Sequence, residues 1–265
     1  MARSFASQGS DQISFGAGNG LNSVTAASLL VWFKHAGAPT SGNWLGIYSE
    51  WADFNDIISV SMKTTNDADN GKLYCLWRTP TEITDFTSAT AWDDGLWHWL
   101  LLVRRTSGNY TELYVDGVSE ASQATDPSTS ATSKTIDWGF DNDAGANASF
   151  GGSLARGMGF TRTLTVEEAK SYAFGRPPLG SVQFYHELIG ASPEPDWSGN
   201  VRSGTLTGTA VADHAPVGPW FGLDLGWQGA FTAAAGGAAL SVNLAGRGGL
   251  AGAGGLAGQG GGLVA

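Results

Sequence analysis

The side chains that could catalyse a reaction are scattered along this sequence. Hydrolysis of a glycosidic bond needs two carboxyl groups on either side of the bond, and an E-x-D-x-E run would place them on one face of a strand. No such run occurs. No serine lies in a G-x-S-x-G elbow, no zinc-ligand spacing is present, and Gly16–Gly20 lacks the lysine of a phosphate-binding loop. The histidines are far apart in the sequence, at His35, His98, His186 and His214. We therefore expect no enzymatic activity and no cofactor.

Short acidic runs give the only indication of a metal site. Asp67 and Asp69 lie in the polar stretch 64–71, and Asp93 and Asp94 form an acidic turn before an apolar stretch. Calcium would need several more oxygen ligands converging on the same point. A D-x-D pair in a loop is more often solvated than metal-bound, so no metal site is assigned.

Exposed tryptophans would support a different chemistry, the stacking of sugar rings. The chain has 11 Trp, and most are expected in the core because Trp is largely buried on average. Those near expected strand ends and loops are Trp44, Trp51, Trp77 and Trp92. They form the hypothesis of a glycan-stacking surface, against the alternative that they lie in the core or at subunit contacts.

A central β-hairpin is predicted over Gly95–Gly117. Residues 97–104 alternate as a strand does, and a polar loop at 106–109 separates them from a second alternation that contains Leu113 and Val115. The pair Asp116-Gly117 then favours a tight turn, because both central positions of a type I′ turn need a positive φ.

This hairpin resembles the core hairpin of laminin-G-like, concanavalin A-like jelly-roll domains. The match lies in Trp97-His98 followed by the run Leu113–Gly117. A second match is Phe150–Ala155 with Gly159–Thr165 and Glu167-Glu168, which resembles the closing segment of the same family. The resemblance implies an all-β fold, an antiparallel two-sheet jelly-roll sandwich, over residues 1–176.

One short helix is predicted at about residues 166–174. Thr165 and Glu168 have the spacing of a capping box, Leu164 stands at the staple position, and Gly175 supplies a left-handed end.

The strand expected at residues 27–33 is apolar on both faces. We expect that strand to be covered on both sides within the chain, or to meet another subunit with one face.

The segment 177–228 is rich in proline and carries a third match. Asp196–Asn200, Gly204–Gly208 and His214–Pro216 resemble the segment that follows the sandwich in many laminin-G-like proteins of bacteriophages. The segment is expected to be an extension that packs on the sandwich or on a neighbouring molecule.

Residues 229–265 are expected to form an extended glycine-rich tail. From residue 244 the motif LAGxGG occurs three times, with Gly at every third position. A three-residue period suits an extended polyproline-II-like helix, whereas the alternative is a flexible tail. Because Gly loses the most backbone entropy on ordering, a partner would have to hold such a tail. The residues expected to make this assembly contact are Leu244, Gly246, Gly249, Leu250, Gly252, Gly255, Leu256, Gly258 and Gly261.

Charge and composition narrow the range of partners. The net charge of −10 would repel a nucleic-acid backbone. Cys75 is the single cysteine, so no intrachain disulfide is expected, and no apolar stretch is long enough to span a membrane. The N-terminal residues lack the apolar run of a signal peptide. We therefore expect a protein that is made in a reducing cytosol or that leaves the cell by a route other than ordinary secretion. The resemblance to bacteriophage proteins implies synthesis in a host cytoplasm and a final location in a virion.

Two functions remain from the sequence. The first is a non-enzymatic structural protein of a bacteriophage virion, either a head decoration or fibre protein or a tail component. It would attach through its C-terminal region and contact copies of itself and other virion proteins. The alternative is a lectin-like carbohydrate-binding module that recognises host-surface glycans.

Overall fold

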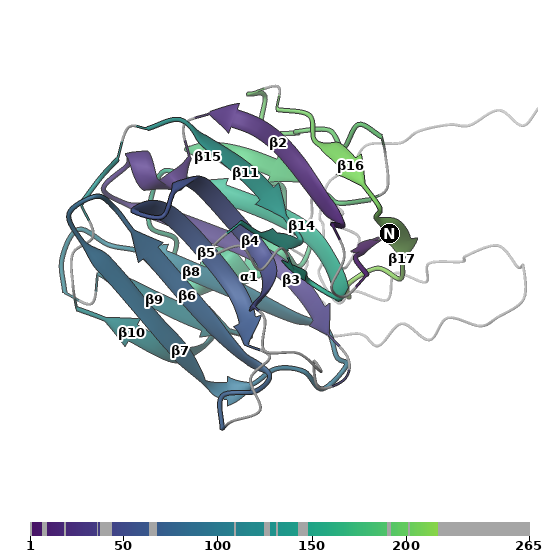
Figure 1. Cartoon of the computed structure of the whole chain (residues 1–265), viewed down its shortest axis with the longest axis horizontal. Coiled ribbons are helices and arrows are strands. Elements are labelled where there is room, and N and C mark those ends of the chain that lie inside the picture. The colour runs from purple at the N-terminus through teal and green to yellow at the C-terminus, as the bar shows by residue number, and fades with distance from the viewer. Residues whose placement is uncertain are drawn as a thin grey trace, which may run out of the picture. The chain divides into compact units, whose positions relative to one another are not determined.

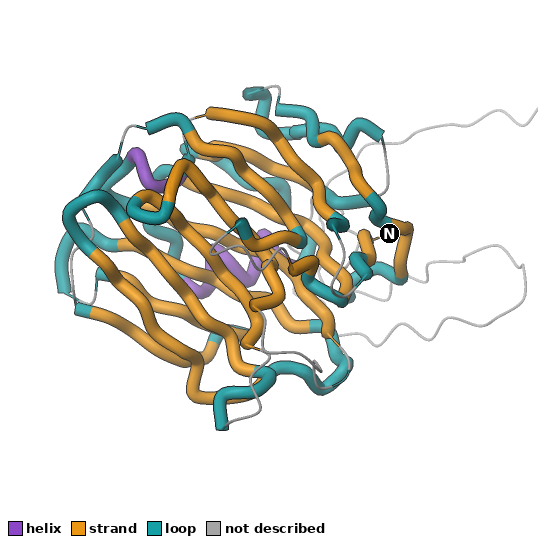
Figure 2. The backbone as a smooth tube through the Cα atoms, viewed as in Figure 1, coloured by secondary structure: helices purple, strands orange, loops and turns teal. Residues whose placement is uncertain are grey.

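The computed structural model describes two stacked β-sheets and one α-helix within residues 2–216. The ranges that are not described inside that span are 7–9, 19, 36, 38–43, 64–67, 109, 125–127, 131, 143–147, 190–191 and 201. Residues 217–265, including the expected glycine-rich tail and all of its assembly residues, lie outside the described part. Figure 2 shows that strands make up most of the described chain.

The first sheet has eight strands and contains the predicted hairpin. Its order is β10-β9-β8-β3-β14-β1-β17, and β15 pairs with β14. Its strands are β10 (Val118–Gln123), β9 (Thr111–Val115), β8 (His98–Arg104), β3 (Ala27–His35), β14 (Gly152–Phe160), β1 (Ala2–Ser4), β17 (Ala210–Ala212) and β15 (Val182–His186).

The second sheet has nine strands and lies against the first (Figure 1). Its order is β16-β2-β11-β4-β5-β6-β7, with β12 and β13 paired beside β4. Its strands are β16 (Thr205–Thr207), β2 (Gln12–Gly18), β11 (Lys134–Trp138), β4 (Trp44–Asp53), β5 (Asp56–Lys63), β6 (Lys72–Arg78), β7 (Ile83–Ala91), β12 (Phe140–Asp141) and β13 (Ala148–Ser149). All described pairings are antiparallel except that of β13 with β4. The predicted all-β antiparallel sandwich is therefore confirmed.

The main core fills the space between the two sheets. Every second residue of β3, namely Leu29, Val31 and Phe33, points into it, and Ile58 and Val60 of β5 meet them from the second sheet. Each such side chain contributes about 1.5–3 kcal/mol through removal from water. This core fixes which residues of each strand point outward.

A second core covers the outer face of the eight-stranded sheet. The alternate residues of β3, Leu30 and Trp32, belong to it, and the helix α1 (Val166–Ala173) supplies Ala169 and Ala173. The Trp32 indole N–H donates to the carbonyl of Ala173 (2.8 Å). Both faces of β3 are thus covered by this chain itself.

The helix and the hairpin form as their sequence signals predict. Thr165 and Glu168 make both hydrogen bonds of the capping box, and α1 begins at Val166. Asp116 and Gly117 have φ values of 51° and 86°, and they join β9 to β10. The strands β8 and β9 pair directly, with Leu100 opposite Val115.

Residues 177–216 join both sheets. The strand β15 extends the eight-stranded sheet beside β14, β17 pairs with β1, and β16 pairs with β2 of the nine-stranded sheet. Asp196 anchors this segment, because its carboxylate accepts backbone N–H groups of Tyr185 (3.0 Å), Ser198 (2.8 Å) and Arg202 (3.2 Å).

Candidate functional site

The outer face of the nine-stranded sheet is defined by the residues that alternate with core residues. Val60 of β5 and Cys75 of β6 point into the core, so their strand neighbours point to the opposite side. The inter-strand register then brings outward-facing residues together in rows. One row is Trp51, Ile57, Arg78 and Ile83, the next is Ser49, Ser59, Leu76 and Asp85, and Trp44 lies opposite Lys63.

A β-bulge places Trp44 and Trp51 on the same face. The two residues are seven positions apart, and strict alternation would put them on opposite faces of β4. The register of β4 with β5 shifts between Gly46 and Tyr48, which adds one residue to β4. Both tryptophans therefore lie on the outer face, and both are half-buried.

The first aromatic cluster, the Trp44–Tyr74 corner, comprises Trp44, Lys63, Tyr74 and Asp85. The Trp44 and Tyr74 rings lie 4.3 Å apart between centroids at 42°. The Lys63 ammonium is 5.4 Å from the Trp44 centroid and 5.6 Å from that of Tyr74, within cation–π range. The Tyr74 hydroxyl donates to Asp85 Oδ2 (3.1 Å). These contacts hold both rings in one orientation.

Lys63 is itself held by a carboxylate. Its Nζ lies 2.8 Å from Asp69 Oδ2, and Lys72 Nζ lies 3.1 Å from Asp69 Oδ1. The hydrogen bonds from Lys63 and Lys72 lower the pKa of Asp69 below its ordinary value. The positive charges beside the corner are therefore already partly balanced.

The second aromatic cluster, the Trp51–Phe54 corner, comprises Trp51, Phe54, Arg78 and Ile83. The Trp51 and Phe54 rings meet edge to face, 5.1 Å apart at 80°. Arg78 Nη1 donates to the Phe54 carbonyl (2.6 Å). Phe54 is 55% exposed and Ile83 is 52% exposed, so this corner is open to solvent.

A short piece of chain crosses the outer face between the two corners. A Cβ on Gly46 would lie 2.2 Å from the carbonyl carbon of Phe140 and 2.2 Å from the backbone nitrogen of Asp141, so only glycine permits this crossing. The Asp141 carboxylate accepts hydrogen bonds from Ser59 (2.9 Å) and Ser61. Residues 140–142, the crossing segment, are thereby fixed over β4 and β5.

The other two tryptophans named from the sequence lie elsewhere. Trp77 is 2% exposed and points into the core, where its indole N–H donates to the Asn22 side chain. Trp92 packs against the main core and edge-on to His98, with 4.7 Å between centroids. Neither lies on the outer face.

The acidic residues named from the sequence do not converge on one point. Asp69 binds Lys63 and Lys72, and Asp94 Oδ1 lies 3.0 Å from His98 Nε2. Asp67 lies outside the described residues. Within the part of the chain that the structure describes, no group of three or more His, Cys, Asp or Glu side chains is placed to hold a metal ion.

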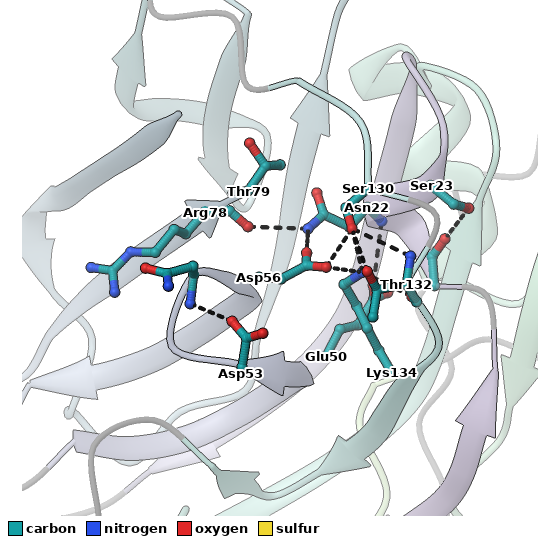
Figure 3. Close-up of polar contacts among 12 residues, drawn as sticks. Asn22, Ser23, Glu50, Asp53, Asp56, Arg78, Thr79, Ser130, Thr132 and Lys134 are labelled. Atoms are coloured by element: carbon teal, nitrogen blue, oxygen red, sulfur yellow. Dashed lines mark hydrogen bonds and ion pairs between the residues drawn. The ribbon is translucent and has the colours of Figure 1, made fainter. Parts of the chain in front are cut away.

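A buried polar cluster closes one end of the core (Figure 3). Lys134 Nζ lies 3.0 Å from Asp56 Oδ2 and donates to the Thr132 carbonyl (3.1 Å). Asn22 Nδ2 donates to Asp56 Oδ1 (2.7 Å), and Ser130 donates to Oδ2 of the same carboxylate. No sequence pattern predicts this cluster, because its members come from separate stretches that are far apart along the chain.

Glu50 adds a second carboxylate to this cluster. Its Oε1 accepts the Leu21 backbone N–H (2.7 Å) and the Tyr48 hydroxyl. Burial raises the pKa of Glu50, and the hydrogen bonds from Tyr48 and Leu21 oppose that rise. Glu50 is 0% exposed and Asp56 is 1% exposed, so both carboxylates are shielded from any solute. The cluster is a structural closure of the core.

Comparisons with known proteins agree with this fold. Residues 7–170 match the family model for the concanavalin A-like lectin/glucanases superfamily. No curated protein sequence matches the chain. In the described part of the chain, no helix is long and apolar enough to cross a membrane.

Two solved structures share the architecture at low sequence identity. A native heptameric SAP-like pentraxin from Limulus polyphemus is 16% identical with a TM-score of 0.54, and the match covers 79% of this chain and 93% of the pentraxin chain. A protein from Bacteroides ovatus, proposed to bind carbohydrate, is 12% identical with a TM-score of 0.58, and the match covers 82% of this chain and 62% of that one. The chain therefore belongs to the concanavalin A-like lectin/glucanase superfamily.

Proposed function

We propose that this protein binds glycans on the outer face of its nine-stranded sheet and does not catalyse a reaction on them. The observation that carries the proposal is the Trp44–Tyr74 corner. Two half-buried rings stand there beside an exposed carboxylate, Asp85, on a sheet face that no described helix covers.

The corner has the two features that sugar recognition needs. The aliphatic C–H face of a sugar packs on an aromatic ring, while its hydroxyls bond to polar side chains placed around that ring. Asp85 and Lys72 supply such groups. Because Lys63 and Asp85 already hold the rings, little conformational entropy is lost on binding.

The family supports binding as the general activity. The superfamily includes lectins by its description, and the Bacteroides ovatus protein of the same fold is proposed to bind carbohydrate. Binding is favoured over hydrolysis because hydrolysis needs two carboxyl groups reaching the same sugar bond. Glu50 and Asp56, the carboxylates of the buried cluster, are closed off from solvent.

Retention on immobilised polysaccharides tests the proposal. The native protein is expected to be retained by at least one polysaccharide, and Trp44→Ala is expected to weaken binding at least about ten-fold, as for other aromatic anchors. Trp197→Ala is the matched control, because Trp197 is 59% exposed but lies beside β15 of the other sheet. Absence of retention, or equal loss in both variants, would overturn the proposal.

A second candidate function is attachment to a bacteriophage particle. It rests on the LAGxGG repeats at 244–261 and on the resemblance of residues 196–216 to segments of bacteriophage proteins. Deletion of residues 229–265 is expected to abolish attachment to the particle and to leave polysaccharide retention unchanged. Attachment that survives the deletion would contradict this candidate.

A further inference from the structure

We infer that the two aromatic corners bind one glycan chain together, so that the ligand is an uncharged polymer of several sugars rather than a single terminal sugar. The inference rests on the proposed function. It adds a second contact at the Trp51–Phe54 corner, and it specifies the length and the charge of the ligand.

The spacing of the corners sets the length of the ligand. With one residue absorbed by the bulge, Trp44 and Trp51 are separated by six strand steps, which at about 3.3 Å per residue gives a distance on the order of 20 Å. A single sugar cannot touch both rings at that distance. A chain of several sugars can.

The crossing segment sets the route between the corners. Its residues cover the outer face at Gly46, Ser59 and Ser61, and the two serines are at most 1% exposed. The direct line along β4 is therefore closed. Leu76 of β6 is itself 1% exposed, so within the described part of the chain the route runs over β7, where Asp85 is exposed opposite Leu76 and Ile83 is exposed opposite Arg78.

Local charge indicates an uncharged ligand. Of the two exposed side chains named on this route, Ile83 is apolar and Asp85 carries a carboxylate, and the chain as a whole has a net charge of −10. Lys63 and Lys72 share Asp69, and Arg78 donates to the Phe54 carbonyl. An acidic sugar would meet a carboxylate along the route, whereas neutral hydroxyls can donate to it.

Isothermal titration with oligosaccharides of increasing length tests the inference on the full-length protein. The probes are linear cello-, manno- and xylo-oligosaccharides from disaccharide to hexasaccharide, with oligogalacturonides as the charged series. For the native protein, affinity for an uncharged series is expected to rise at least about ten-fold from the shortest to the longest member, because the second contact becomes intramolecular. The charged series is expected to bind more weakly at every length.

The variants separate the two corners. Trp51→Ala is expected to abolish the gain in affinity with ligand length, whereas Trp44→Ala is expected to weaken binding at every length. Phe54→Ala provides a second test of the same corner with a smaller change to β4, and Trp197→Ala is the control.

The outcomes distinguish the inference from the proposed function. One outcome is that Trp51→Ala and Phe54→Ala bind oligosaccharides of every length with the affinity of the native protein, while Trp44→Ala loses binding. In that case the two-corner inference is overturned and the proposed function stands. Tighter binding of the charged series would overturn the choice of an uncharged ligand. If no series binds and no polysaccharide is retained, both proposals fail.

Discussion

Lys134 places a positive charge in a part of the core that water does not reach. Its side chain is 0% exposed, and Asp56, 3.0 Å away, is 2% exposed at its side chain. Asp56 also accepts hydrogen bonds from Asn22 and Ser130. Such a pair contributes little net stability by itself, but removal of one partner leaves an uncompensated buried charge.

Lys134→Met is therefore expected to destabilise the protein by about 3–5 kcal/mol, the usual cost of breaking a buried ion pair. Denaturant unfolding followed by tryptophan fluorescence measures the loss. The double variant Lys134→Met with Asp56→Asn removes both charges and is expected to recover part of it. A single variant as stable as the native protein would contradict this account of the pair.

Protonation of His98 makes the stability of the central hairpin depend on pH. Its Nδ1 lies 2.6 Å from Asp116 Oδ2 and its Nε2 lies 3.0 Å from Asp94 Oδ1. Burial disfavours the protonated ring, but the hydrogen bonds to Asp116 and Asp94 outweigh burial and raise the pKa of His98. In the folded state the ring therefore holds its proton to a higher pH than in the unfolded chain.

The stabilisation from His98 is expected to be complete below its ordinary pKa of about 6.5 and to be lost as pH rises through the raised folded-state pKa. Denaturant unfolding of the native protein and of His98→Gln from pH 5 to pH 9 measures this effect. The difference in unfolding free energy between the two proteins should decrease as pH rises. NMR titration of the His98 ring gives the pKa directly. A value below the ordinary one would contradict this account.

At the scale of elements, the crossing segment depends on one glycine of β4. A side chain at Gly46 would meet the backbone of Phe140 and Asp141 rather than the end of a flexible side chain. The Asp141 carboxylate also accepts hydrogen bonds from Ser59 and Ser61, so a displacement of the crossing segment would break these bonds.

Gly46→Ala is therefore expected to cost about 1–3 kcal/mol, as overpacking in a tight site does. Thermal unfolding monitored by circular dichroism measures it. Ser61→Ala is the companion variant, which loosens the segment without a clash and is expected to cost less. Equal stability of Gly46→Ala and the native protein would show that the crossing is not tight.

The segment that follows the helix depends on one carboxylate. Asp196 accepts three backbone N–H groups, from Tyr185, Ser198 and Arg202. Asp196→Ala leaves these donors without their acceptor and is expected to cost about 1–3 kcal/mol, with a smaller loss for Asp196→Asn. Hydrogen exchange of the three amides should accelerate in the alanine variant. Unchanged exchange would contradict the anchoring role.

The elements differ in how far their sequences predict them. The helix α1 follows from the capping box of Thr165 and Glu168, because the bonds that start a helix are local. The sequence of β10 does not predict a strand, because it is polar and Ser/Ala-rich and lacks an apolar alternation. It forms because β9 offers an edge and because Glu120 accepts the Thr90 backbone N–H of β7 (2.9 Å). The β9 edge is adjacent in sequence, but Thr90 is 30 residues away from Glu120.

At the scale of the whole molecule, the two sheets differ in what covers their outer faces. On the eight-stranded sheet, α1 and the second core cover the outer face at β3 and β8. The outer face of the nine-stranded sheet keeps half-buried or exposed aromatic side chains at both corners. This asymmetry supports the proposal that the binding face lies on the nine-stranded sheet.

The fold class and the family could be predicted from the sequence, but the proposed binding face could not. The Trp97–Gly117 hairpin and the closing segment are local patterns, and they sufficed for the sandwich. The sequence does not distinguish the outer-face residues Trp44 and Trp51 from Trp77 and Trp92. A strict alternation of faces along the strand does not predict the bulge at Gly46–Tyr48, which brings Trp44 and Trp51 onto one face. The burial of Trp77 depends on core neighbours such as Asn22, which is far away in the chain.

The most direct measurement of the central claim is an NMR titration that follows the tryptophan indole N–H signals of the full-length protein. The ligand is an oligosaccharide prepared from a polysaccharide that retains the protein. On its addition, the signals of Trp44 and Trp51 are expected to shift, while those of the buried Trp77 and Trp138 stay unchanged. Shifts confined to Trp97 or Trp197, with Trp44 and Trp51 unmoved, would contradict a binding face on the nine-stranded sheet.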